Sequence, residues 1–124
     1  YILDDSNLFA YNTKENKWET LEPASHSFGK STRGQLNYDT ASSMVIAISF
    51  RGTKHGKPQG AYVYNPDTNI WSDPTSAMPN VKGTMTSFYH TEFNAHFLHY
   101  AGDSRDNGKF LVYRYKAQKK ESVK

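Results

Sequence analysis

The sequence predicts an all-β protein that is built from repeated strand units. Aromatic residues make up 15% of the chain, and these side chains favour the pleated, half-buried surface of a sheet. No stretch of useful length shows the hydrophobic period of an amphipathic helix. Residues 8–19 and 61–72 repeat one pattern at a constant separation of 53 residues. A repeat of this period indicates a solenoid, a propeller or another array of stacked units.

Each copy of the pattern predicts a strand, a polar turn and a second strand that carries a tryptophan. The first copy predicts strands at residues 8–12 and 17–21, and the second predicts strands at residues 60–65 and 69–73. The matching positions are Tyr11 and Tyr64, Asn12 and Asn65, Asn16 and Asn69, and Trp18 and Trp71.

The remaining strands complete the units. Residues 44–50 are the most apolar and β-branched run, and they predict a strand that is buried on both faces. Residues 33–38 predict the strand before it, and the last predicted strands span residues 84–90, 95–101 and 109–115. The domain organisation is therefore a folded part at 1–115, with units at about 1–21, 33–73 and 84–115, and a basic tail at 116–124.

A four-stranded unit of about 50 residues that closes with a tyrosine, a polar turn and a tryptophan resembles the kelch repeat of β-propellers. Tyr11 with Trp18, and Tyr64 with Trp71, carry the resemblance, and Tyr113 marks a truncated third copy. The chain has single glycines where kelch blades usually carry a pair. WD-type repeats are the alternative, but the chain has neither their Trp-Asp nor their Gly-His pair.

The resemblance implies four-stranded antiparallel blades in a ring that this chain does not complete. We therefore expect the C-terminal part of a longer propeller, with ring closure by several copies of the chain as the alternative. A lone sheet has two faces to bury, so neighbouring blades must cover it. The side chains expected to pack between blades are Tyr62, Tyr64, Tyr113, Tyr115, Trp18 and Trp71.

Composition narrows the classes of partner. The net charge of +3 arises from the tail at 116–124, and the preceding residues carry equal numbers of acidic and basic side chains. A neutral folded part lacks the basic stripe that nucleic acid requires, so no nucleic-acid partner is expected. The chain has no cysteine, which excludes disulfides and thiolate chemistry. No apolar run approaches the length of a membrane helix, so no membrane partner is expected, and the compartment stays open.

Kelch-like propellers commonly bind partners through loops that join second to third strands and through the connections between blades. The resemblance therefore makes this loop face the expected site for a protein or glycan. Its candidate binding residues are His26, Lys30, Arg33, Arg51, Lys54, His55, Lys57, Asp103, Arg105 and Asp106. The alternative for each of these residues is that a polar loop is simply solvated.

The densest histidine cluster consists of His90, Glu92, His96 and His99. His96 and His99 are three positions apart on a predicted strand, so they point to opposite faces. A zinc site needs three or four converging ligands, and we therefore expect structural or exposed histidines and no metal. The sequence also lacks a Gly-x-Ser-x-Gly elbow and a phosphate-binding loop. No catalytic residue and no cofactor is assigned.

The first functional hypothesis is a non-catalytic binding or scaffolding module that holds a protein or glycan through its loop face. The alternative is a fragment of a carbohydrate-active propeller enzyme, namely an oxidase, lyase or epimerase with its active site at the central channel. Arg33, Gln35 and Thr84 are the residues expected to line such a channel. Clustered acids or a metal at the axis would favour the enzyme.

Overall fold

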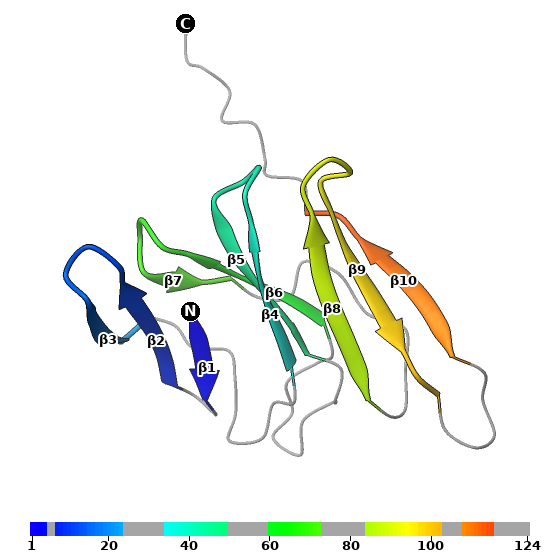
Figure 1. Ribbon diagram of the computed structural model, residues 1–124, viewed down its shortest axis with the longest axis horizontal. Coiled ribbons are helices and arrows are strands. Elements are labelled where there is room, and N and C mark those ends of the chain that lie inside the picture. Colours follow the sequence, from blue (N-terminus) through cyan, green and yellow to red (C-terminus); the bar gives the residue numbers. More distant parts are fainter. Residues whose placement is uncertain (5–6, 24–33, 50–59, 73–83, 103–107, 116–124) are drawn as a thin grey trace, which may run out of the picture.

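The computed structural model describes residues 1–4, 7–23, 34–49, 60–72, 84–102 and 108–115 (Figure 1). These residues form ten strands and no helix, so the predicted all-β class is confirmed. Within this part of the chain there is accordingly no helix with the length and apolar character needed to cross a membrane.

The strands form three antiparallel sheets, here named the first, middle and last sheets. The first sheet consists of β1 (Ile2–Asp4), β2 (Asn7–Asn12) and β3 (Lys17–Leu21). The middle sheet consists of β4 (Gly34–Asp39), β5 (Met44–Ser49), β6 (Gly60–Asn65) and β7 (Ile70–Trp71). The last sheet consists of β8 (Met85–His90), β9 (Ala95–Tyr100) and β10 (Lys109–Tyr113). Strands that are consecutive in sequence pair within each sheet, and none of the sheets closes on itself.

The observed strands lie close to their predicted positions, with one addition. The addition is β1, for which the sequence carries no strand pattern and which pairs with β2 through Ile2–Phe9 and Leu3–Leu8. The strand predicted at 69–73 begins one residue later, because Asn69 has a positive φ of 54° and still belongs to the turn.

The middle sheet is buried on both faces, because a further sheet lies on each side of it (Figure 1). Successive side chains of a strand point to opposite faces, so neighbouring residues of β5 enter different clusters. The cluster shared with the first sheet consists of Leu8, Val45, Ala47, Tyr62, Tyr64 and Trp71. The cluster shared with the last sheet consists of Ile46, Ile48, Ala61, Val63, Met85, Leu98 and Tyr100. The predicted two-sided burial is therefore confirmed for β5.

One hairpin register recurs four times in the described residues. In each case a tyrosine near the end of the first strand faces one residue near the start of the second strand. The pairs are Tyr11–Trp18, Tyr38–Val45, Tyr64–Trp71 and Tyr89–His96. The predicted match between the two Tyr–Trp hairpins is confirmed. The β4–β5 and β8–β9 hairpins have the same register, with valine and histidine respectively at the tryptophan position.

Each of these four turns ends in a residue with left-handed backbone. The residues are Asn16, Ser43, Asn69 and Asn94, with φ values of 55°, 59°, 54° and 46°. Asparagine adopts this conformation more readily than most residues, because its short polar side chain can form local hydrogen bonds. The three asparagines also accept a hydrogen bond from the hairpin tyrosine: Tyr11 to Asn16, Tyr64 to Asn69 (2.9 Å) and Tyr89 to Asn94 (2.8 Å). This bond explains why tyrosine and asparagine recur together in the repeat.

The two tryptophans of the repeat differ in burial. Trp71 is 4% exposed, and its ring centroid lies 5.2 Å from that of Tyr64. Trp18 makes the same contact with Tyr11, at 5.1 Å, but is 54% exposed. Trp18 lies on the face of the first sheet that points away from Leu8 and the middle sheet. Trp71 is thus packed as predicted, whereas no described residue covers Trp18, and its packing between blades stays a prediction.

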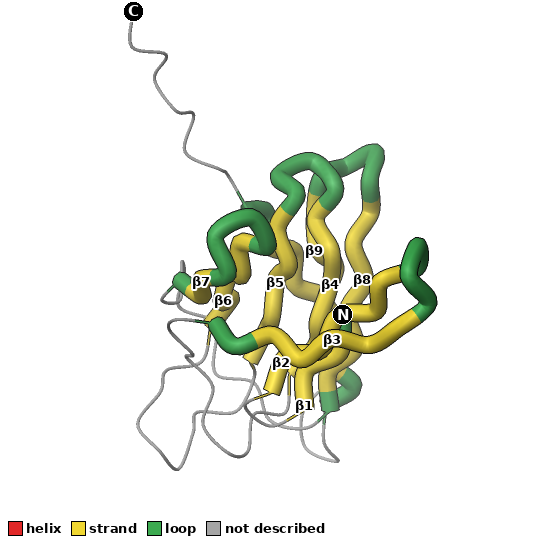
Figure 2. The backbone as a smooth tube through the Cα atoms, turned by 90° about the vertical axis from the view of Figure 1, so that its left-hand side faces the viewer, coloured by secondary structure: helices red, strands yellow, loops and turns green. Residues whose placement is uncertain are grey.

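The middle and last sheets approach each other along their first strands. Figures 1 and 2 show β4 and β8 side by side. The Asn37 side-chain amide on β4 donates a hydrogen bond of 2.6 Å to the Ser87 hydroxyl on β8. The two sheets therefore stack face to face while their first strands stay in contact.

Candidate functional site

The ten loop-face candidates lie outside the described residues, so their positions stay a prediction. They fall within residues 24–33, 50–59 and 103–107. Of the residues expected at a channel, Gln35 is half-buried on β4 and Thr84 is exposed just before β8. The backbone carbonyl of Thr84 accepts a hydrogen bond from the Ala101 N–H at 3.2 Å.

The histidines of the last sheet separate as predicted. His96 is fully buried on β9, whereas His99 is exposed and its ring lies 4.7 Å from that of Phe110. His90 ends β8, with its ring 4.7 Å from that of Phe93. The described residues contain no group of three or more His, Asp or Glu side chains that could hold a metal ion.

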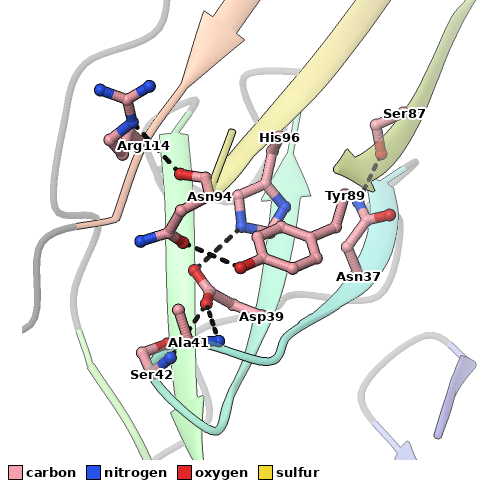
Figure 3. Close-up of polar contacts among 9 residues, drawn as sticks. All are labelled: Asn37, Asp39, Ala41, Ser42, Ser87, Tyr89, Asn94, His96 and Arg114. Atoms are coloured by element: carbon pink, nitrogen blue, oxygen red, sulfur yellow. Dashed lines mark hydrogen bonds and ion pairs between the residues drawn. The ribbon is translucent and has the colours of Figure 1, made fainter. Parts of the chain in front are cut away.

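Figure 3 shows a polar cluster where the middle and last sheets meet near their tight turns. Its centre is Asp39, the last residue of β4, which is completely buried. Asp39 Oδ1 accepts hydrogen bonds from the backbone N–H groups of Ala41 and Ser42, both at 3.0 Å. This Asx turn explains the position of an acid at the end of β4, since an Asp side chain satisfies the N–H groups that the turn leaves unpaired.

The second carboxylate oxygen of Asp39 reaches the neighbouring sheet. Asp39 Oδ2 lies 3.4 Å from Nε2 of His96 on β9. The His96 ring lies between two tyrosines, with centroids 4.9 Å from Tyr89 and 5.8 Å from Tyr113. One carboxylate therefore closes its own turn and also connects the middle sheet to the last sheet.

Burial controls the ionisation of this pair. Removal from water lowers the pKa of the His96 imidazole below its ordinary value of 6.5, and the hydrogen bond and negative charge of Asp39 only partly oppose this effect. His96 is therefore neutral at pH 7. The tautomer protonated at Nε2 is the one that can donate to Asp39. The buried Nδ1 has no hydrogen-bond partner among the described residues.

Three further hydrogen bonds surround the cluster. Tyr89 donates its hydroxyl proton to Asn94 within the β8–β9 hairpin. Arg114, just after β10, donates from Nε to the Asn94 carbonyl at 3.2 Å and from a terminal guanidinium nitrogen to the Phe93 carbonyl at 3.1 Å. The arginine thus satisfies carbonyl oxygens of the turn from the third strand of the sheet.

The arrangement is suited to joining sheets and not to reacting with a solute. Asp39 and His96 resemble the carboxylate–imidazole pair of a general base, but both residues are 0% exposed. A general base must reach the proton that it removes, and both side chains of this pair are buried. The pair therefore acts as a buried polar contact between two sheets.

Sequence reasoning did not find this pair, because its members belong to different units. A usable signal was nevertheless present. When the β4–β5 and β8–β9 hairpins are superimposed, His96 takes the place of Val45 and His90 takes the place of Asp39. A histidine at a core position that its repeat fills with valine requires a buried polar partner.

The comparisons with known proteins give no relative. The chain matches no protein-family model, and neither a curated protein nor a solved structure is significantly similar to it.

Proposed function

We propose that this chain is part of a kelch-like β-propeller and acts as a non-catalytic binding or scaffolding module for a protein or a glycan. The observation that carries the proposal is the stacking of three sheets, in which the middle sheet is covered on both faces. Each sheet of a propeller is covered in the same way by the blades before and after it. The contact between β4 and β8 agrees with this arrangement, because the first strands of adjacent blades are neighbours at the propeller axis.

Strand direction supports the loop face as the binding surface. The β4–β5 and β6–β7 turns leave the same end of the middle sheet, and Figure 1 shows the β2–β3 and β8–β9 turns on the same side of the molecule. At the opposite end, Gly34 pairs with Ser49 and Ser49 pairs with Gly60. The segments that carry the candidate residues start from these opposite strand ends. Long connections on a rigid sheet scaffold are common sites of partner binding.

The placement of the one acid–base pair in the described part of the chain supports a binding role. The one His–Asp pair among the described residues is enclosed between two sheets. A carbohydrate-active enzyme is therefore the alternative outcome of the test and not the proposal.

The test is a binding screen with two matched variants. The purified chain is applied to a glycan array and is also cross-linked to candidate proteins, and each hit is titrated. The loop-face variant carries Arg51→Ala, Lys54→Ala and Lys57→Ala, and the turn-side variant carries Lys14→Ala and Lys17→Ala. We expect the loop-face variant to lose at least tenfold in affinity and the turn-side variant to bind normally.

Two results would contradict the proposal. Loss of binding in the turn-side variant alone would place the site at the other end of the sheets. Chemical turnover of a bound glycan, detected by mass spectrometry of the glycan after incubation, would establish the enzyme alternative.

A further inference from the structure

The outward face of the first sheet carries a group of exposed aromatic and apolar side chains. Tyr11 and Trp18 form an aromatic pair there, and Ile2 and Phe9 extend the patch along β1 and β2. Ile2, Tyr11 and Trp18 are all more than two-fifths exposed. Exposed aromatic and apolar side chains that lie together in this way are typical of surfaces that another protein surface covers.

The repeat shows what covers such a face. The positions of Phe9, Tyr11 and Trp18 correspond to Tyr62, Tyr64 and Trp71 of the middle sheet, and those three side chains are buried. Their cover is the inward face of the first sheet, which contributes Leu3, Leu8 and Leu21. A face with the tyrosine–tryptophan pair thus packs against the opposite face of the preceding sheet.

The exposed face of the last sheet corresponds to the face with which the middle sheet contacts the last sheet. Phe110 and Val112 on β10 are 72% and 59% exposed. On the neighbouring strands, the Phe97 ring stacks on Phe88 at 5.4 Å, and His99 lies against Phe110. By register, Phe97, His99, Phe110 and Val112 correspond to Ile46, Ile48, Ala61 and Val63 of the middle sheet. Those four residues are buried against the last sheet.

We propose that a second copy of this chain docks head to tail, with the outward face of its last sheet on the Tyr11–Trp18 face of the first copy. The interface continues the two sheet contacts already present within the chain, and the surfaces that it joins are of the two types that pack together there. The proposal uses the stacking of the sheets and is independent of loop-face binding. It goes beyond that function, because it states what covers the two end faces, namely the Tyr11–Trp18 face of the first sheet and the outward face of the last sheet.

The contact is heterologous, since two different surfaces meet. Such a contact forms a closed ring if the rotation between copies permits it, and otherwise an open chain. Blocking either face should therefore stop the assembly of further copies. Two chains that are blocked at different faces should still bind each other through their two intact faces.

The experiment uses Trp18→Asp and Phe110→Asp, which place a charge on one end face each. Both side chains are more than half exposed, so both variants should fold, which circular dichroism and thermal unfolding would verify. Light scattering and sedimentation then give the mass over a concentration series. We expect the wild-type chain to associate, each variant alone to be monomeric and their equimolar mixture to form a dimer.

The controls are Thr13→Asp and Thr91→Asp, which introduce the same charge at exposed turn positions and should associate like the wild type. Three results would overturn the proposal: a wild-type chain that stays monomeric at every concentration, a single variant that associates as strongly as the wild type, or a mixture that stays monomeric. A wild-type chain that stays monomeric would mean that sheets other than those of a second copy cover the two exposed faces. The second would indicate contact between like faces.

Discussion

Trp71 and Trp18 occupy equivalent positions of two hairpins, but only Trp71 is buried. Trp71 belongs to the cluster between the first and middle sheets, together with Leu8 and Tyr62. The same side-chain type on the same local backbone therefore allows a comparison in which burial is the main difference.

We predict that Trp71→Ala lowers the free energy of unfolding by about 3–5 kcal/mol, because it removes a large buried side chain and leaves a cavity. Trp18→Ala should cost less than about 1 kcal/mol, as is usual at exposed positions. Urea denaturation at low protein concentration, where the chain is monomeric, measures both. Equal losses for the two variants would contradict the difference in burial.

At the scale of elements, the hairpin turns follow one design with one exception. The β4–β5 turn has Ser43 at the left-handed position that asparagine occupies in the other three turns. The left-handed backbone conformation costs more free energy for serine than for asparagine. Tyr38 stands where the hydrogen-bonding tyrosine stands in the other hairpins.

We predict that Ser43→Asn raises the free energy of unfolding by about 0.5–1 kcal/mol, in the range of other substitutions that restore a repeat consensus. The gain has two sources, namely lower backbone strain and a new acceptor for the Tyr38 hydroxyl. Combining the substitution with Tyr38→Phe in a double-mutant cycle separates them. If Ser43→Asn lowers stability, the equivalence of the four turns does not extend to their energetics.

The hairpins could be predicted because their information is local. Tyr64, Asn69 and Trp71 lie within one turn and its strands, so their spacing in the sequence reflects their contacts. β1 was missed because three residues without a matching copy give no periodic pattern, although a turn signal follows them. The Asp39–His96 contact was missed because it joins different sheets, and register within a hairpin carries no information on which side chains meet across a stack. The loop-face residues stay predictions, since the described residues do not include them.

At the scale of the whole molecule, the buried pair links stability to pH. The unfolded chain protonates His96 near its ordinary pKa of 6.5, whereas burial lowers the pKa in the folded state. Between these two pKa values the unfolded state binds more protons, so stability falls as pH falls. The loss begins near pH 6.5 and levels off below the pKa of the folded state.

We predict that lowering the pH from about 7.5 to 5.5 destabilises the wild-type chain more than His96→Gln. Glutamine keeps an N–H donor for Asp39 but does not titrate. Thermal unfolding at several pH values measures the difference. The exposed His99→Gln variant should retain the wild-type pH dependence, and an unchanged dependence in His96→Gln would refute the assignment.

The Asp39–His96 contact also bears on how similar sheets find their correct neighbours during folding. Repeated units present nearly interchangeable apolar faces, and proteins built from them are prone to misassembly. If the last sheet stacked on the first, His96 would be buried against the face formed by Leu3, Leu8 and Leu21. A buried imidazole without a hydrogen-bond partner is costly. The polar pair thus identifies the middle sheet as the proper neighbour of the last one, and it sets the order of the units where their hydrophobic surfaces alone would leave it ambiguous.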